Sequence, residues 1–163
     1  MSRTTRLTLV REASRYLGAL SVLLVGVVHA QQYYQAYFSV VPVIGTLFLL
    51  SFIGSGITGV ALFAPVRRLL PKLADPLLVL TALGAIGIAL GSLISLLVSE
   101  YTPLFGFMES GYRLAVVLAI VFDATTAVFL TVFIALVLRT HHRHEEATVH
   151  DFPMTTTPER KAS

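Results

Sequence analysis

Residues 114–138 read LAVVLAIVFDATTAVFLTVFIALVL, and Asp123 is the one acidic residue inside this apolar run. An α-helix needs about 20 consecutive apolar residues to cross the hydrocarbon core of a bilayer, so the run predicts a transmembrane helix. Steps of four residues along it meet mostly small side chains: Ala115, Ala119, Asp123, Ala127, Thr131 and Ala135. Residues four apart share a helix face, and small side chains let membrane helices approach closely. We therefore expect Asp123 to point into a helix bundle.

The composition of the whole chain is that of a membrane protein. Hydrophobic residues make up 55% of the 163 positions and charged residues 13%, whereas a soluble domain has roughly a quarter of its residues charged. Four apolar runs account for most of the chain, which predicts one all-α domain, residues 16–138, built as a four-transmembrane-helix bundle in the lipid bilayer. The helices are expected at residues 16–37, 43–63, 77–98 and 114–138.

The placement of basic residues predicts the orientation. Of the twelve Lys and Arg residues, eleven lie in the N-terminus, the second loop and the C-terminal tail, and Arg113 lies alone on the other side. Basic residues flanking membrane helices stay on the cytoplasmic side. We expect both termini to be cytoplasmic and the protein to reside in the cell membrane. The same placement explains the net charge of +3 without nucleic acid as a partner.

The two ends of the chain are expected to lie outside the bundle. Residues 1–15 form a basic cytoplasmic N-terminus in which Arg11 and Arg15 would face anionic headgroups from a short helical turn. The same start, followed by an apolar run and Val28-His29-Ala30, is also typical of a secretory signal peptide that is cleaved near residue 30. Residues 139–163 lack apolar periodicity and predict a disordered cytoplasmic tail.

Rows of small residues predict close helix packing. The second helix carries Ser51, Ser55 and Gly59 four apart, and the third carries Gly87 and Gly91. Such spacing is typical of helix interfaces in membranes, so we expect these two helices to form a tight hairpin. In the fourth helix, Ala119 and Ala127 flank Asp123 and are expected to pack in the same way.

Asp123 is the first candidate for a functional site. A carboxylate near the centre of a membrane helix costs about 2.5–3.5 kcal/mol on insertion scales, and such residues often serve a function. One interpretation is a proton carrier, cation site or ligand anchor. The other is a protonated or threonine-bonded acid that fixes helix packing, with Thr125, Thr126 or a serine of the third helix as its partner. The sequence leaves both open.

His29 is the natural partner for Asp123, because the predicted helices place the two at nearly equal depth. One hypothesis is a His29–Asp123 contact lined by Tyr33 and Ser95. The competing interpretation places His29 at the outer interface among the tyrosines that follow it. The apolar loop 100–113 is expected to lie on the membrane surface or over the mouth of the bundle, and its Glu109 is a further site candidate.

Motifs for catalysis and cofactor binding are lacking in this sequence. No phosphate-binding loop, metalloprotease, serine-hydrolase or dinucleotide signature occurs, and there is no cysteine. A haem held by two histidines would need a second histidine in the membrane. The tail histidines His141, His142 and His144 lack the fixed scaffold that a metal site requires. We therefore predict a protein that is not an enzyme and carries no cofactor or metal.

Two stretches carry a resemblance. His29 with its following tyrosines, then PVIGTLFLL at residues 42–50, and the loop PLFGF at residues 103–107 resemble small four-helix membrane proteins of high-GC Gram-positive bacteria. The resemblance implies the four-helix topology and a cell-membrane location. It also implies that His29 and the outer loop belong to one outward-facing feature, and it transfers no catalytic residue.

Two functions remain compatible with the sequence. The first is a non-enzymatic accessory or interaction protein that packs through its small-residue faces against itself, as a homo-oligomer, or against a larger membrane complex. The alternative is a small oligomeric transporter or ligand-binding membrane protein that uses Asp123, together with His29 and Glu109, in an outward-facing cavity. A cavity that reaches Asp123 from the outer loop would favour the second, and a fully packed surrounding the first.

Overall fold

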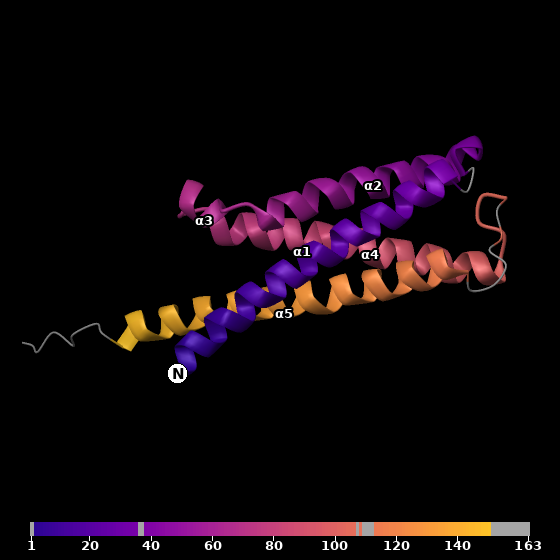
Figure 1. Ribbon diagram of the computed structural model, residues 1–163. Helices are drawn as coiled ribbons and strands as arrows, with labels where there is room; N and C mark the ends of the chain where they lie inside the picture. The colour runs from indigo at the N-terminus through magenta and orange to yellow at the C-terminus, as the bar shows by residue number, and fades with distance from the viewer. Residues whose placement is uncertain (1, 36–37, 107, 109–112, 151–163) are drawn as a thin grey trace, which may run out of the picture.

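The computed structural model describes residues 2–35, 38–106, 108 and 113–150, and it describes only the backbone of residues 3–4, 38 and 141–150. Over this part the chain is helical, as predicted (Figure 1). The elements are α1 (Arg3–Gln35), the short 3₁₀ helix η1 (Phe38–Val40), α2 (Pro42–Phe63), α3 (Val66–Leu69), α4 (Ala74–Tyr101) and α5 (Leu114–His150).

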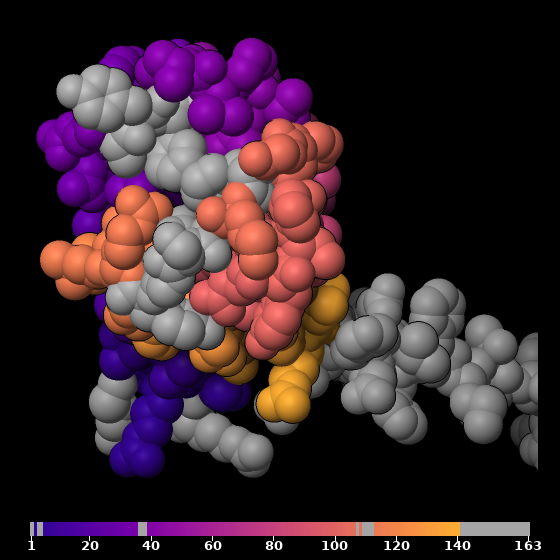
Figure 2. Space-filling view, turned by 90° about the vertical axis from the view of Figure 1, so that its right-hand side faces the viewer, coloured from indigo at the N-terminus to yellow at the C-terminus, as the bar shows by residue number. Residues whose placement is uncertain are grey.

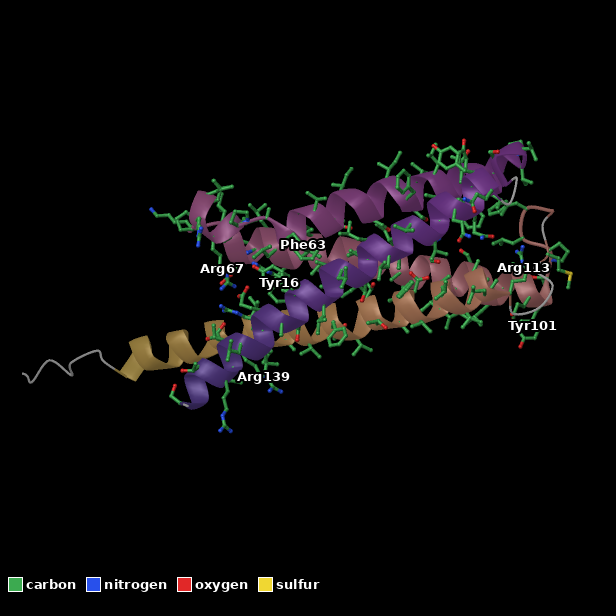
Figure 3. The ribbon with its side chains drawn as sticks, viewed as in Figure 1. Tyr16, Phe63, Arg67, Tyr101, Arg113 and Arg139 are labelled. Atoms are coloured by element: carbon green, nitrogen blue, oxygen red, sulfur yellow. The ribbon has the colours of Figure 1, made fainter. Side chains whose placement is uncertain are left out.

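Four of these helices are long and apolar enough to span a membrane: Thr5–Gln35, Pro42–Phe63, Ala74–Tyr101 and Leu114–Thr140. The start of α1, the short helix α3 and the end of α5 lie at one end of the molecule, which we call the basic end (Figure 1). Residues 102–106 and η1 lie at the opposite end, which we call the loop end. Arg67 and Arg139 lie at the basic end, and Arg113 lies at the loop end (Figure 3).

Two of the predicted boundaries are wrong. The first helix begins at Arg3 and not at residue 16, so residues 3–15 continue the membrane helix and do not form a separate segment. The last helix continues to His150, through the first half of the predicted disordered tail. Both extensions lack Gly and Pro, the residues that most strongly interrupt a helix. Residues 151–163 lie outside the described part of the chain.

The first helix is the most deeply buried of the four long helices. It crosses the others diagonally and contacts α2 along one side and α5 along the other (Figure 1). More than half of its spanning segment is buried, against about a fifth in each of the other three. Ala19, Val22 and Val25 are completely buried. The first helix is therefore an integral part of the packed bundle.

The core lies toward the basic end and is made by all four long helices. Its buried members are Ala19, Val22, Leu62, Leu78, Ala82, Ala85, Leu130, Phe133 and Val137. Glycines let α1 approach its neighbours. A Cβ atom at Gly18 would collide with the Leu130 side chain of α5, and one at Gly59 would lie 2.5 Å from Leu23 Cδ2 of α1.

The small-residue rows pack differently from the prediction. Ser55 and Gly59 are buried against α1 and not against α4: a Cβ atom at Gly26 of α1 would lie 3.1 Å from Ser55 Cβ. Gly87 and Gly91 pack against nothing, because a Cβ atom at either would meet no described atom within 4 Å. The α2–α4 contact uses other glycines, with Gly54 facing Ile88 and Gly84 facing Thr58.

The small stripe of the last helix is only partly inward. Asp123 is buried and Ala119 and Ala127 are half-buried, but Thr131 and Ala135 are exposed. With 3.6 residues per turn, each step of four residues rotates about 40° around the helix, so a long row of fours leaves the interface. The face that is buried along α5 is instead Val116, Asp123, Thr126, Leu130, Phe133 and Val137.

Candidate functional site

A cavity of about 370 Å³ lies in the half of the bundle toward the loop end. Its walls come from all four long helices and from Leu104 of the loop. Figure 2 looks onto this end, with the start of α2 on one side and the end of α4 and the start of α5 on the other. A volume of this size falls within the range of small-molecule pockets, roughly 300–1,000 Å³.

Polar side chains gather on the wall of an otherwise apolar cavity. Ser92, Ser95 and Ser99 of α4 are spaced i, i+3 and i+7 and so share one helix face, and His29 and Gln32 face them from α1. Among the described residues that line the cavity, none is Asp, Glu, Lys or Arg. The cavity therefore offers hydrogen-bonding groups without a formal charge.

His29 is held in a defined orientation. Its side chain is 5% exposed, and its Nδ1 lies 2.9 Å from the carbonyl oxygen of Val25, one turn earlier. A carbonyl only accepts hydrogen bonds, so Nδ1 carries the proton and Nε2 of the neutral ring is the acceptor. Nε2 lies 3.4 Å from Ser92 Oγ, which therefore donates to it. The edge of Phe48 packs on the imidazole, with ring centroids 5.4 Å apart.

Asp123 lies behind this wall and not in it. It is 0% exposed, while Ala119, one turn nearer the loop end, lines the cavity. Ser92 interacts with its carboxyl group, although neither carboxyl oxygen reaches hydrogen-bond geometry with a described group. Thr125 donates to the carbonyl of Val121 at 2.6 Å, so it is not the partner of Asp123.

Ser92 thus stands between the two candidates that the sequence singled out. It contacts His29 at one side and Asp123 at the other, and no direct hydrogen bond between His29 and Asp123 occurs among the described residues. Steps of four along the third helix pass through Gly91 and Ser95 and so miss Ser92. The i, i+3, i+7 spacing of the three serines is the signal that would have found it.

The remaining candidates, Ser95, Tyr33 and Glu109, differ in where they lie. Ser95 lines the cavity, but Tyr33 does not; its ring packs edge-on against Tyr34, with centroids 4.9 Å apart. Glu109 lies outside the described residues. Leu104 lines the cavity, so the described part of the loop lies over the bundle mouth. The loop turns at Phe105 and Gly106, where φ is 51° and 82°.

Of the residues predicted to pack helices, four belong to the cavity instead. They are Ser51, Gly87, Gly91 and Ala119. Ser55 and Gly59 lie outside it, in the contact between α1 and α2. Rows of small residues therefore occur both at close helix contacts of this bundle and on the wall of its cavity.

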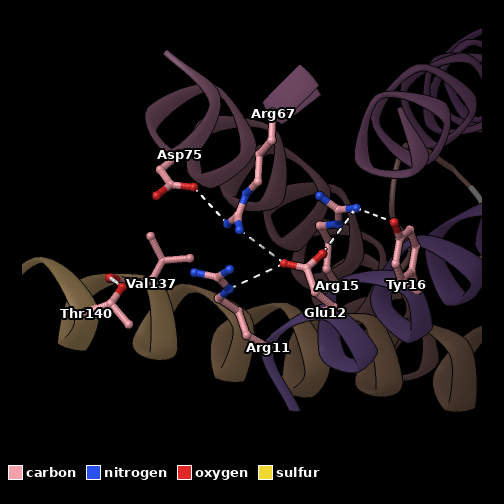
Figure 4. A network of polar contacts seen from close by, with 8 residues as sticks. All are labelled: Arg11, Glu12, Arg15, Tyr16, Arg67, Asp75, Val137 and Thr140. Carbon is pink, nitrogen blue, oxygen red and sulfur yellow. Dashed lines mark hydrogen bonds and ion pairs between the residues drawn. The ribbon is translucent and has the colours of Figure 1, made fainter. Parts of the chain in front are cut away.

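A second polar cluster lies at the basic end (Figure 4). The Glu12 carboxylate forms ion pairs with Arg11, Arg15 and Arg67 at 3.3–3.4 Å, and Arg67 also pairs with Asp75 at 2.8 Å. Arg15 is 4% exposed and donates to the Tyr16 hydroxyl. The prediction that Arg11 and Arg15 face lipid headgroups is therefore wrong. Both are held by Glu12 of the same helix, and the cluster ties α1 to α3 and to the start of α4.

Within the part of the chain that the structure describes, no group of three or more His, Cys, Asp or Glu side chains is placed so that it could hold a metal ion. The tail histidines belong to the residues whose side chains are not described. The site is therefore an uncharged cavity with a buried acid behind one wall.

No family model, curated protein or solved structure matches this chain.

Proposed function

We propose that the protein is a multi-pass membrane protein that binds a small molecule in the cavity at the loop end. The observation that carries the proposal is the cavity of about 370 Å³ with His29 and the three serines of α4 on its wall. Polar groups placed within a membrane are costly unless they find partners. A bound ligand would supply hydrogen-bond partners to the polar groups on the cavity wall.

The proposed orientation places the cavity in the outer half of the cell membrane. The arginines of α1 and the residues Arg67, Arg68 and Lys72 between α2 and α4 lie at the basic end, and basic residues favour the cytoplasmic side. The loop end, with the cavity, would then face outward. The resemblance to small four-helix proteins of high-GC Gram-positive bacteria is compatible with this placement and stays a prediction.

Asp123 has a supporting role in this proposal. It does not line the cavity, so it would not touch the ligand. Ser92 lies near its carboxyl group and within 3.4 Å of His29 Nε2. We propose that Asp123 positions the Ser92 hydroxyl, and that His29 and Ser92 present the resulting polar surface to the ligand.

The experiment is native mass spectrometry of the full chain extracted in mild detergent and supplemented with a polar lipid extract of the host cells. We expect a bound small molecule on the wild type, its loss in Ser95→Phe, which fills the cavity, and its retention in Val98→Phe, which adds the same ring on the exposed side of α4. Equal spectra for all three proteins would contradict the proposal.

The second candidate is an accessory protein that packs against another copy or a larger membrane complex. It is supported by the open surface at Gly56, Gly87 and Gly91, where a Cβ atom would meet nothing within 4 Å, since such surfaces accept a neighbouring helix. Cross-linking in intact membranes tests it. A partner held at Gly87 and Gly91 would favour this candidate, and a monomer would count against it.

A further inference from the structure

We infer that the ligand is a membrane-dissolved amphiphile, with an apolar chain and an uncharged head that donates hydrogen bonds, and that it enters sideways from the bilayer between α2 and α4. The inference rests on the proposed binding function and deepens it. Its basis is a gap in the wall of the cavity at Gly87 and Gly91, which we call the glycine notch.

The glycine notch connects the cavity to the lipid-facing surface. Gly87 and Gly91 line the cavity, yet both are exposed, and a Cβ atom at either would meet no described atom within 4 Å. Two residues of α2 likewise line the cavity and reach the outer surface of the bundle. They are Leu47 and Leu50, which are 41% and 59% exposed. The cavity therefore continues to the surface of the bundle between these two helices.

The depth of the notch decides what can reach it from the side. In α4, Gly87 lies thirteen residues after Ala74 and fourteen before Tyr101, or about 20 Å from either end at 1.5 Å per residue. A hydrocarbon core about 30 Å thick covers such a position on all sides. Acyl chains are present there and water is not, so an apolar chain is the group that meets the notch.

The polar groups lie where the head of such a molecule would lie. From the notch, Ser92, Ser95 and Ser99 follow α4 toward the loop end, and Ser92 to Ser99 covers about 10 Å. The wall thus changes from apolar at mid-membrane to polar near the surface. A lipid of the adjoining leaflet has the same order, with its chain at the midplane and its head at the interface.

The hydrogen bonds within the wall indicate the chemistry of the head. Ser92 gives its proton to His29 Nε2, and Ser99 gives its proton to the carbonyl of Leu96 at 2.7 Å. Both hydroxyl oxygens keep lone pairs that accept. With no Asp, Glu, Lys or Arg among the described lining residues, the wall offers no partner for a charged head. A hydroxyl or amide group is the match.

A helix of a second copy is the competing occupant of the notch. An α-helix with its side chains is about 10–12 Å in diameter. It would cover Gly87 and Gly91 from outside, and it would not fill the space behind them as far as His29. A single apolar chain fits both the opening and the cavity, which favours the amphiphile.

The test uses the lack of tryptophan in this chain. Phe48→Trp places one indole on the cavity wall. The full-length variant is reconstituted in phosphatidylcholine bilayers that contain a diacylglycerol, which has an uncharged hydroxyl head, with brominated acyl chains that quench tryptophan on contact. We expect strong quenching, its loss when Gly91→Leu closes the notch, and its retention with Gly91→Ala, which is too small to close it. Gly56→Leu is the matched control, since Gly56 is equally open and lies away from the cavity.

The other outcomes separate this inference from the proposed function. Quenching by acrylamide in water, with no effect of Gly91→Leu on quenching by brominated lipid, would show entry from the loop end; it would overturn the amphiphile and leave ligand binding in place. If neither quencher reaches the indole, the cavity is closed and both proposals fail. Loss of a cross-linked dimer in Gly91→Leu would assign the notch to a second copy and overturn the inference.

Discussion

At the scale of single residues, Ser92 connects the two groups that matter most for the proposed site. His29 is fixed from one side by the carbonyl of Val25 and from the other by Ser92. Asp123 is completely buried, and its described neighbour on α4 is the same serine. A hydroxyl can donate to only one acceptor at a time, so the two groups compete for Ser92 or share it.

This arrangement predicts an energetic coupling that passes through the serine. His29→Gln and Asp123→Asn, made singly and together, should show an interaction energy of about 0.5–1 kcal/mol in the free energy of unfolding. The same pair of substitutions in a Ser92→Ala background should be additive, because the connecting hydroxyl is gone. Unfolding in mixed detergent micelles, followed by circular dichroism, measures all the variants.

The control for this cycle is Ser95→Ala, which removes a neighbouring wall hydroxyl and should leave the coupling intact. A coupling that persists without Ser92 would mean that His29 and Asp123 interact directly, as the first hypothesis from the sequence had it. If the two substitutions were strictly additive in the wild-type background, His29 and Asp123 would not be energetically coupled.

The site could be predicted from sequence at some residues and not at others. Asp123 was found because a carboxylate in an apolar run is chemically conspicuous, and the local stripe placed it inward correctly. Ser92 was missed because serine is common in membrane helices and the row of fours passes it by. Whether an acid touches a cavity or lies behind its wall depends on the rotation of the helix by tens of degrees, which residue spacing alone does not define.

At the scale of helices, glycine spacing predicted contacts but not partners. A helix presents several faces, and a row of small residues does not say which neighbour will meet it. In this bundle α1 takes the two tightest glycine contacts, at its own Gly18 and against Gly59 of α2, because it lies between α2 and α5. The row at Gly87 and Gly91 was expected to form a tight hairpin and instead borders open space.

The crossing of α1 and α5 gives the prediction at this scale. Gly18→Ala should destabilise the protein by about 1–3 kcal/mol, the usual cost of overpacking, because the new Cβ atom takes space that Leu130 occupies. Leu130→Ala alone should cost about 2–5 kcal/mol, and the double variant should lose less than the sum of the two. Thermal unfolding in detergent of the four proteins measures the difference.

Gly56→Ala is the control for the crossing, because its added methyl group meets no described atom within 4 Å. It should leave stability unchanged or raise it slightly through helix propensity. Equal losses in Gly18→Ala and Gly56→Ala would show that helix propensity or lipid contacts govern these glycines and that α1 does not approach α5 as closely as described.

At the scale of the whole molecule, the two halves of the bundle differ in kind. The half toward the basic end has a packed core and is fastened by the ion pairs of Glu12, Arg67 and Asp75. The half toward the loop end holds the cavity. Since ligand-binding regions are drawn from the less tightly packed parts of a protein, this division suits a binding site on one side of the membrane and an anchor on the other.

Sequence reasoning was most successful at this largest scale. The number of spanning helices and the all-helical fold followed from run lengths alone, because a bilayer core sets how many apolar residues a helix needs. The helix ends beyond the membrane were wrong at both termini, since nothing in the bilayer limits a helix once it has left the hydrocarbon. The ion pairs at the basic end were missed for a related reason: Arg11 and Arg15 were assigned to lipid, whereas both pair with Glu12, and the long α1 brings Glu12 to Arg67.

The proposed orientation is the last consequence, and the lack of cysteine makes it directly measurable. Thr102→Cys places a thiol on the exposed loop end, and Lys72→Cys places one on the exposed basic end, between α3 and α4. A membrane-impermeant maleimide added to intact cells should label Thr102→Cys at once and Lys72→Cys only after the membrane is opened, because the arginines of α1 with Arg67, Arg68 and Lys72 lie at the basic end and basic residues favour the cytoplasmic side. The wild type, without a thiol, gives the background. Labelling in the reverse order would show that the protein has the opposite orientation, with the cavity in the inner leaflet. Labelling of both thiols in intact cells would contradict the single membrane crossing, by α4, that separates Lys72 from Thr102.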